Sequence, residues 1–565
     1  MVSSLSIEPV FPSGSAELTL VYNPAAIESL IHVGISLIEN SRSDIGLRLI
    51  KRAVRVDRSH GTSARENLGV AFLISGRLTD AILQLSCAVA TCCDRASVYV
   101  HIGIALERQN QYERAAIAYR RAINLGQLRA DIFNALGVFL DSSGHSDQAR
   151  VFFKKSIVLQ PNYGDCLSNY ADSSVGELSE DESISWGNRA HLSDPTNPVI
   201  IFNHGCLLQR LLKLHDAQLI FDRALSIAPT DADTRFNKAL NSLTLGRFAE
   251  GWADYEWRWR TRVARSAGLP IINFKPPTIS EIKNKTIIIF HEQGFGDSIQ
   301  FSRYGRLASQ SGANVILSLP GPLIRLFETQ PWVTEVIKSG SSMPSCDYYC
   351  PMMSLPLMFA TSIESIPFNA GAYLSAPYAD AQRWCDFLSE KFLEPNIRVG
   401  LVWNGGFRPD RPDLRRANIQ RNVSLEAFSR ALDIEGINYI ILQKGDPAEA
   451  EIRDREHLYW TRSRVYNAGS FLSDFADTAG LIANLDLVIT VDTATAHLSA
   501  ALGKPTWILN RYNTCWRWLL DRQDSPWYSA VRLYRQGVDR NWASTLTRVA
   551  ADLRRVAARH IGSGS

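Results

Sequence analysis

The stretch Thr286-Ile-Ile-Ile-Phe-His-Glu-Gln-Gly-Phe-Gly-Asp297 governs how the second half of the chain folds. Four apolar residues follow Thr286, and they predict a short buried strand. Gly294 and Gly296 predict a tight turn, and Asp297 stands where an N-cap would open the next helix. In open α/β sheets, ligands bind at the carboxyl ends of such strands. The stretch therefore predicts either a ligand site or a purely structural turn.

Strand and helix patterns alternate through the rest of this half. Strands are expected near residues 286–290, 313–319, 336, 398–403, 438–443, 485–492 and 505–510. Helices are expected near residues 298–310, from 322, and near 379–392, 424–432, 474–484, 494–502 and 542–557. A loop-rich stretch carries Pro351, Pro356, Pro367 and Pro377. The two series, separated near residue 395, predict an α/β architecture of two Rossmann-like domains that face a cleft.

The first half of the chain repeats with a period of 34 residues. Small residues mark the period at Gly69, Gly103, Gly137, Ala171, Gly205 and Ala239. A second set follows at Ala81, Ala115, Ala149, Ser183, Ala217 and Gly251, and a further copy with Gly34 and Gly46 is out of step by one residue. This period, with small residues where two helices cross, is the tetratricopeptide signature and predicts an α-solenoid, a superhelix with a groove. The copy around Ser183 is the most degenerate, so we expect an irregular turn there.

A solenoid of this kind typically binds a peptide or a partner protein. Asparagines recur near one phase of the first helix of each repeat, at Asn67, Asn134, Asn169, Asn203 and Asn237. Their amides could hold the backbone of an extended acceptor peptide, or they could be polar contacts between helices. The aromatic run from Gly251 to Arg260 is expected to pack the end of the solenoid onto the next domain.

Composition excludes several classes of function. The net charge of +3 is too small to favour a nucleic-acid or membrane surface. Nine cysteines lack zinc-site spacing, and no Asp-x-Asp follows residue 285, so we expect no metal site. No apolar run reaches the roughly 18 residues that a membrane span needs, and no signal peptide is visible. These features predict a cytoplasmic protein without a membrane span.

Polar residues follow two of the expected strands in the last third of the chain. Asp492, Thr493 and Thr495 open a helix that also carries His497, and a helix N-terminus with hydroxyls favours phosphate. His497 could donate to an oxyanion there, or it could simply pack against its neighbours. A basic loop with Arg408, Arg411, Arg415, Arg416 and Arg421 precedes Ser424. Most of these arginines are expected to be solvated, but Arg421 could clamp a diphosphate.

Three motifs together resemble a known family. They are Gly294-Phe-Gly-Asp297, the strand Val399–Trp403, and Val491-Asp-Thr-Ala-Thr-Ala-His-Leu498. They resemble the heptosyltransferase-like (family 9-like) GT-B glycosyltransferases, and more narrowly bacterial proteins that fuse tetratricopeptide repeats to such a domain. Asp474–Ala479 and Trp516–Tyr528 are similar to stretches of those fusions. In these fusions we expect an acidic residue at the position of Cys515.

The resemblance implies inverting, metal-independent transfer of a sugar from a nucleotide-sugar co-substrate, without a further cofactor. Asp297 matches the catalytic base that takes a proton from the acceptor hydroxyl. The residues assigned to donor binding are Gly294, Gly296, Trp403, Arg421, Gln443, Asp492, Thr493, Thr495 and His497. The nucleotide and the sugar stay open.

The expected domains follow from these boundaries. They are an N-terminal tail (1–30), tetratricopeptide repeats (31–260), a linker (261–284), the N-terminal GT-B half (285–394) and the nucleotide-sugar-binding half (395–565). The solenoid favours a protein acceptor, with a flagellar or surface protein as one option and Asn134, Asn169, Asn203 and Asn237 as acceptor contacts. Because residues 286–377 are few for this fold, the solenoid is expected to supply part of the acceptor wall. Two alternatives stay open: a protein-binding scaffold with a degenerate GT-B domain, and a sugar transferase of the lipopolysaccharide type.

Overall fold

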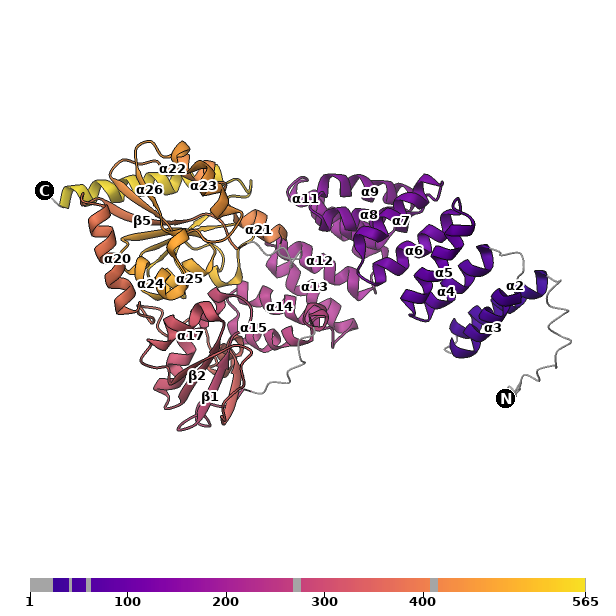
Figure 1. The fold of residues 1–565 in the computed structure, drawn as a ribbon, viewed down its shortest axis with the longest axis horizontal. Helices are drawn as coiled ribbons and strands as arrows, with labels where there is room; N and C mark the ends of the chain where they lie inside the picture. The colour runs from indigo at the N-terminus through magenta and orange to yellow at the C-terminus, as the bar shows by residue number, and fades with distance from the viewer. Residues whose placement is uncertain (1–23, 40–42, 57–61, 268–275, 407–414, 564–565) are drawn as a thin grey trace. The chain divides into compact units, whose positions relative to one another are not determined.

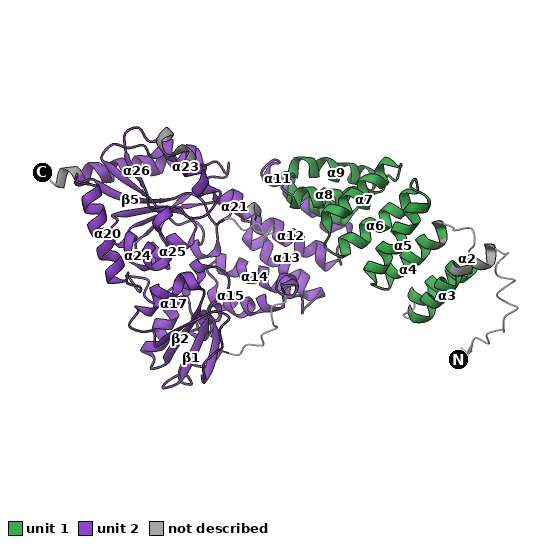
Figure 2. Cartoon of the chain, in the orientation of Figure 1, with its two compact units in different colours: residues 1–174 green, residues 175–565 purple. Residues whose placement is uncertain are grey.

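The computed structural model describes residues 24–39, 43–56, 62–267, 276–406 and 415–563. The chain forms two compact units, residues 1–174 and residues 175–565 (Figure 2). Among the described residues, no helix combines the length and the apolar character needed to cross a bilayer. The first unit is helical, and the second combines helices with two parallel sheets (Figure 1).

Unit 1 consists of helical pairs, as the 34-residue period predicts. The helices are α2 (Pro24–Glu39), α3 (Ser43–Val56), α4 (Thr62–Ile74), α5 (Leu78–Thr91), α6 (Ala96–Arg108), α7 (Tyr112–Asn124), α8 (Ala130–Ser142), α9 (Ser146–Leu159) and α10 (Gly164–Ser173). The small residues lie where the two helices of a pair touch. A Cβ added to Gly103 would lie 2.4 Å from the ring of Tyr119, and one added to Gly137 would lie 2.4 Å from that of Phe153. The predicted solenoid and the reason for its glycines are confirmed.

Two irregular copies have distinct causes. A Cβ on Gly46 would lie 2.3 Å from the carbonyl oxygen of Gly34, so the out-of-step first copy crosses its helices glycine to glycine. Its first helix begins at Pro24, inside the expected N-terminal tail. In the degenerate copy, α10 ends at Ser173, and a short parallel bridge joins Val175 to Leu178 before the next helix. The expected irregular turn is therefore present.

Unit 2 starts with the remaining repeats. Its helices here are α11 (Glu180–Ser193), α12 (Pro198–Arg210), α13 (Leu214–Ile227), α14 (Ala232–Thr244) and α15 (Phe248–Tyr255), followed by η1 (Glu256–Arg260) and α16 (Arg262–Ser266). A capping box between Ser179 and Glu182 starts α11, because each residue supplies a partner for the backbone N–H of the other. The expected linker from residue 261 thus begins with a short helix.

The first sheet has four parallel strands in the order β3-β2-β1-β4. The strands are β1 (Thr286–Phe290), β2 (Asn314–Leu319), β3 (Glu335–Lys338) and β4 (Tyr348–Pro351). Helices α17 (Phe295–Gln310), α18 (Ile324–Glu328), α19 (Leu355–Met358) and α20 (Tyr378–Lys391) accompany them. Strand β4 lies in the stretch that the prolines had marked as loop. It has four residues and ends in proline, which hides a strand pattern in the sequence.

The second sheet has six parallel strands in the order β10-β9-β8-β5-β6-β7. The strands are β5 (Ile397–Val402), β6 (Ile437–Ile441), β7 (Arg464–Asn467), β8 (Leu487–Val491), β9 (Thr506–Asn510) and β10 (Val531–Arg535). The helices are α21 (Arg415–Arg421), α22 (Leu425–Leu432), α23 (Ala448–Tyr459), α24 (Phe475–Ala483), α25 (Ala494–Ala501) and α26 (Trp542–Ser563). The sequence did not predict β7, β10 and α23. The two missed strands lie at the sheet edges and are short, so their apolar pattern is weak.

The expected basic loop before Ser424 is in part the helix α21, which ends at Arg421. Arg408 and Arg411 lie outside the described residues, as do the side chains of Arg415 and Arg416. Only Arg421 of this group has a described side chain.

One buried cluster joins the last repeat to both sheets. It contains Phe248 and Trp252 from α15, Phe301 from α17, and Trp516 and Trp527 from the segments that follow β9. The Trp252 ring meets those of Phe301 and Trp516 edge to face, with centroids 6.4 and 5.3 Å apart. Its indole N–H donates to the carbonyl oxygen of Thr361 at 3.1 Å. The aromatic junction therefore packs the solenoid onto the next domain, as predicted.

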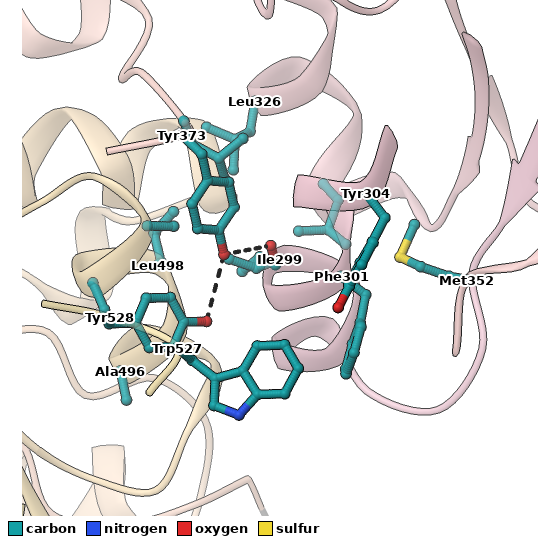
Figure 3. Packing of buried hydrophobic residues seen from close by; sticks show 14 of the residues in the cluster. Ile299, Phe301, Tyr304, Leu326, Met352, Tyr373, Ala496, Leu498, Trp527 and Tyr528 are labelled. Carbon is teal, nitrogen blue, oxygen red and sulfur yellow. Dashed lines mark hydrogen bonds between the residues drawn. The ribbon is translucent and has the colours of Figure 1, made fainter. Parts of the chain in front are cut away.

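The same cluster joins the two sheet domains to each other. Figure 3 shows Trp527 and Tyr528 of the C-terminal half beside Ile299 and Phe301 of α17. Tyr373 donates its hydroxyl to the carbonyl oxygen of Ile299 at 3.0 Å and lies 3.4 Å from the hydroxyl of Tyr528. The contacts of Trp527 and Tyr528 with Phe301 and Tyr373 cross from one half to the other, so the two halves share a core at the first turns of α17.

We expect Trp252→Ala to cost about 3–5 kcal/mol of unfolding free energy, because it empties the centre of the shared cluster. The control is Trp257→Ala in η1, since Trp257 is only partly buried and contacts the guanidinium groups of Arg235 and Arg260. Urea unfolding of both variants measures the difference. Equal stability of the two variants would show that the cluster does not hold unit 2 together.

Candidate functional site

Asp297 lies in the first turn of α17, after β1, and not at the expected N-cap, which is Gly294. Its Oδ2 accepts the backbone N–H of Gly294 at 2.8 Å, which closes the turn between strand and helix. Its Oδ1 forms an ion pair with the guanidinium of Arg517, which lies in the segment after β9. The Asp297 side chain keeps 19% of its surface exposed, and that of Arg517 keeps 10%. Asp297 is therefore anchored on two sides and still reachable.

Arg517 is held by both halves of the α/β region. Its Nε donates to Oε1 of Gln300 on α17 at 2.8 Å, and its Nη1 donates to Sγ of Cys515 at 3.2 Å. Its guanidinium lies 4.3 Å from the ring centroid of Trp516. Burial opposes the charge, but Asp297, Cys515 and Tyr255 together outweigh it and raise the pKa of Arg517 above its usual value. The sequence placed Arg517 in a family-like stretch but gave it no role.

The first turns of α17 and α25 approach closely. A Cβ added to Gly296 would lie 2.9 Å from Cδ2 of His497 and 3.3 Å from Cα of Ala494. A side chain at position 296 would therefore push the two helices apart. Because each helix N-terminus carries partial positive charge, two of them at one place favour a bound anion. The positions of Gly296 and Asp297 thus depend on the start of α25.

His497 is buried and has contacts on several sides. Its Nδ1 lies 2.9 Å from the Tyr528 hydroxyl, and its ring stacks on Trp518 with centroids 5.3 Å apart. Burial lowers its pKa to about 4, so the imidazole is neutral near pH 7. This packing agrees with the alternative expected from the sequence. A neutral imidazole can still donate one hydrogen bond, so the oxyanion role stays a prediction.

Arg421 joins the ends of two neighbouring strands. Its Nη1 donates to the carbonyl oxygen of Asp492 at 3.0 Å, and its Nη2 donates to Oδ1 of Asn418 at 2.7 Å. A Cβ on Gly405 would lie 1.9 Å from Nη2 of Arg421, so a side chain there would displace the guanidinium from this position. The structure therefore brings Arg421 and Asp492 together at the carboxyl ends of β5 and β8, which pair in the sheet.

The threonine hydroxyl groups predicted for the start of α25 lie beside Asp492 at the carboxyl end of β8. Thr493 is the N-cap of α25, and its hydroxyl lies 3.0 Å from that of Thr490. Its side chain accepts no backbone N–H of the helix. Thr495 is partly buried in the first turn. Together with Asp492 and His497, these residues form one group at the start of α25.

Two residues assigned to the donor lie deeper. The Gln443 Oε1 accepts the backbone N–H groups of Trp403 and Asn404, at 3.2 and 3.0 Å. Its Nε2 donates to the carbonyl oxygens of Asn404 and Lys444. Trp403 is fully buried against Phe428 in the core of the second sheet. In this structure both residues support the loop after β5, and their predicted donor contacts stay untested.

The asparagines of the repeats have different surroundings. In unit 1, Nδ2 of Asn169 donates to Oδ1 of Asn134 at 3.0 Å, which is the polar helix–helix contact considered above. In unit 2, Nδ2 of Asn237 donates to the carbonyl oxygen of Asp233 in its own helix. Asn203 on α12 is partly buried. A peptide-binding ladder of these residues remains a prediction.

The last repeat also holds the loop before Asp297. Arg258 of η1 binds both oxygens of Glu292, with Nε–Oε2 and Nη2–Oε1 distances of 2.9 and 3.0 Å. Nε2 of Gln293 donates to the hydroxyl of Tyr255 at 2.8 Å. Gln293 has a φ of 65°, a left-handed conformation that is unusual for residues other than glycine. The solenoid end thus fixes the turn from which α17 starts.

A cavity of about 390 Å³ lies between the repeats and the second sheet domain. One wall comes from α12, the start of α13, and α14, and the other from residues Arg511 to Trp516 after β9. Asn237 of the predicted acceptor set belongs to the first wall. The solenoid therefore contributes a wall to a cavity whose opposite side leads to Arg517.

Comparisons with known proteins agree with these features. Residues 430–514 match the family model described as glycosyltransferase family 9 (heptosyltransferase). Residues 34–90 and 96–125 match models of the tetratricopeptide repeat. The chain is thus a glycosyltransferase that carries a module of tetratricopeptide repeats, which confirms the resemblance drawn from the sequence.

The sequence of one curated relative aligns with most of this chain. Protein FlbA of Caulobacter vibrioides is 24% identical over 486 residues, which cover 81% of this chain and 72% of FlbA. Among solved structures, a tetratricopeptide repeat protein from Parabacteroides merdae matches with 14% identity, covers 42% of this chain and 96% of its own, and has a TM-score of 0.36. PilF of Pseudomonas aeruginosa matches with 18% identity over 40% of this chain and 99% of its own, with a TM-score of 0.34.

The lowered pKa of His497 predicts a loss of stability in acid. The unfolded chain takes up this proton near pH 6.5, while the folded chain resists until about pH 4, so protons favour unfolding as pH falls through that window. Between pH 7.5 and 5.5 this group alone should remove about 1.4 kcal/mol of unfolding free energy. Urea unfolding at both pH values should show a smaller acid loss for His497→Gln than for wild type. The same loss in both proteins would contradict the assignment.

Proposed function

We propose that the protein is an inverting, metal-independent glycosyltransferase that moves a sugar from a nucleotide-sugar to a hydroxyl group of a protein acceptor. The observation that carries the proposal is the place of Asp297. Its carboxylate lies at the carboxyl end of β1, where α17 and α25 begin. The family 9 match supports the reaction class, since it covers the segment that contains β8, α25 and β9.

Asp297 acts in this proposal as the general base. It takes the proton of the acceptor hydroxyl while that oxygen attacks the anomeric carbon of the donor, and the nucleoside diphosphate leaves from the opposite face. A carboxylate is a weak base, so position matters more than basicity. The bonds to Gly294 and Arg517 supply that position.

The leaving diphosphate belongs at the start of α25. Backbone N–H groups of this helix, the Thr493 hydroxyl and the Arg421 guanidinium would face the negative charge that develops on the phosphate. Neutral His497 would add one hydrogen bond without a charge of its own. No metal ion is needed in this arrangement, because a helix N-terminus and an arginine offset the charge.

The repeats support a protein acceptor. Tetratricopeptide modules are surfaces for protein partners, and here the last repeat both walls a cavity and fixes the loop before Asp297. A lipid acceptor would need neither feature. The proposal names no particular acceptor protein or sugar. A flagellar or surface protein that is modified in the cytoplasm is an acceptor of the proposed kind.

Asp297→Asn should lower sugar transfer about 10²- to 10⁴-fold, because an amide cannot accept the proton. The amide oxygen can still accept the N–H of Gly294, so the turn should persist. The control is Glu335→Gln in β3, which removes an exposed carboxylate from the same half. Transfer is measured with a radiolabelled donor and a cell extract from which the product is separated as protein or as lipid. Unchanged transfer by Asp297→Asn would disprove the base, and a product in the lipid fraction alone would favour the lipopolysaccharide-type alternative.

A nucleotide-sugar should stabilise the protein against heat. At a hundred times its dissociation constant, a ligand adds about 2.7 kcal/mol to the unfolding free energy. A thermal-shift series with UDP-, GDP-, ADP-, dTDP- and CMP-sugars should show one preferred base, and Arg421→Gln should reduce that shift. No shift with any donor would favour the alternative of a binding scaffold with a degenerate transferase domain.

A further inference from the structure

The cavity between α12, α14 and the segment after β9 has a distinct chemistry. Amide and hydroxyl side chains line it on both sides, including Gln209 and Asn237 from the repeats and Asn513 and Thr514 from the opposite wall. Two arginines, Arg210 and Arg511, complete its polar lining. Among the described residues that line it, none carries a carboxylate. Leu212, Leu214, Leu240 and Trp516 make the rest of the lining apolar, so the cavity combines polar and apolar surface, and its charged side chains are both arginines.

Further cations surround this cavity. Lys213 lies in the turn between α12 and α13, and burial together with Arg210 lowers the pKa of Arg540, so these two guanidinium groups lie near each other. Glu180 binds Lys213 at 3.3 Å and accepts a hydrogen bond from the hydroxyl of Tyr512 at 3.0 Å. The charged side chains in the lining itself, Arg210 and Arg511, favour a ligand with negative charge.

The amides suit a polypeptide backbone. Gln209 donates its Nε2 to the carbonyl oxygen of Asn237 at 3.1 Å, and Asn513 donates its Nδ2 to Oε1 of Gln420 at 3.1 Å. These bonds orient an amide group from each wall. An amide group carries two N–H donors and an acceptor oxygen, the same groups that pair with a peptide unit. A peptide segment between the walls would meet oriented partners on both sides.

A short chain of contacts leads from the cavity to Asp297. Cys515 and Trp516 belong to the lining. The Sγ of Cys515 lies 3.2 Å from Nη1 of Arg517, and Trp516 stacks on the same guanidinium. Arg517 in turn forms the ion pair with Asp297. A segment bound in the cavity would therefore contact residues that position the proposed base.

We propose that this cavity is the subsite for the acceptor, and that it selects an extended peptide segment with acidic side chains beside the hydroxyl that receives the sugar. The inference rests on the proposed function for the identity of the occupant as an acceptor. A nucleotide is the competing occupant, but the groups assigned to the diphosphate, Arg421, Asp492 and Thr493, are not part of the lining. The charge and the amides together favour the peptide.

The test uses the full chain and two fluorescein-labelled peptides. Both are twelve residues long with alternating serine, one with aspartate and the other with lysine at the intervening positions. Fluorescence anisotropy should show the acidic peptide binding at least about tenfold more tightly than the basic one. In Arg210→Gln this preference should shrink, and in Arg210→Glu it should vanish or reverse. Because two variants of Arg210 are compared, the test stays valid if one of them folds poorly.

Arg223→Glu is the matched control. Arg223 is exposed on α13 and does not line the cavity, so the same change of charge should leave the preference intact. Equal binding of both peptides, equal effects of Arg210→Glu and Arg223→Glu, or no binding of either peptide would overturn the proposal. Displacement of the acidic peptide by a nucleoside diphosphate would assign the cavity to the donor. Peptide binding without any sugar transfer would keep this subsite and reject the proposed function instead.

Discussion

The packing of the Trp252 indole holds the parts of unit 2 together. The indole lies in the last repeat, donates to a backbone carbonyl of the first sheet domain, and meets aromatic rings from both sheet domains. Removal of this side chain would therefore expose buried surface of the last repeat and of both sheet domains. The repeats of unit 2 therefore do not behave as a tethered accessory, because their last helix is part of the core of the transferase domain.

The contact between the last repeat and the first sheet domain extends to the candidate site. Arg258 and Tyr255 hold Glu292 and Gln293, the residues immediately before the Gly294–Asp297 turn. From the other side, Arg517 fixes the Asp297 carboxylate, and Gly296 permits α25 to approach. Three parts of the chain thus determine the position of the Asp297 carboxylate. A shift of the last repeat would therefore move the turn that carries Asp297.

The residues that the sequence singled out divide by their surroundings. Gly296, Asp297, Asp492, Thr493 and His497 lie at strand ends and helix starts, where a local pattern of strand, turn and helix marks them, whereas Arg421 is the last residue of α21. Trp403 and Gln443 share that pattern but are buried under the loop that they support. A sequence pattern places a residue at the end of a strand, but it does not tell whether the side chain faces a ligand or the backbone beside it.

The sequence by itself determined the repeat architecture, the two α/β series and the resemblance to glycosyltransferase family 9. These depend on local periodicity and on short motifs, which the chain carries wherever it folds. Only the tertiary structure decided that Arg517 meets Asp297, that the last repeat fixes the turn before Asp297, and that α12 and α14 share a cavity with the segment after β9. Arg517 and Asp297 are 220 residues apart, and no periodicity connects positions at that distance. Their meeting follows from the packing of three domains around one aromatic cluster, which is a property of the folded chain alone.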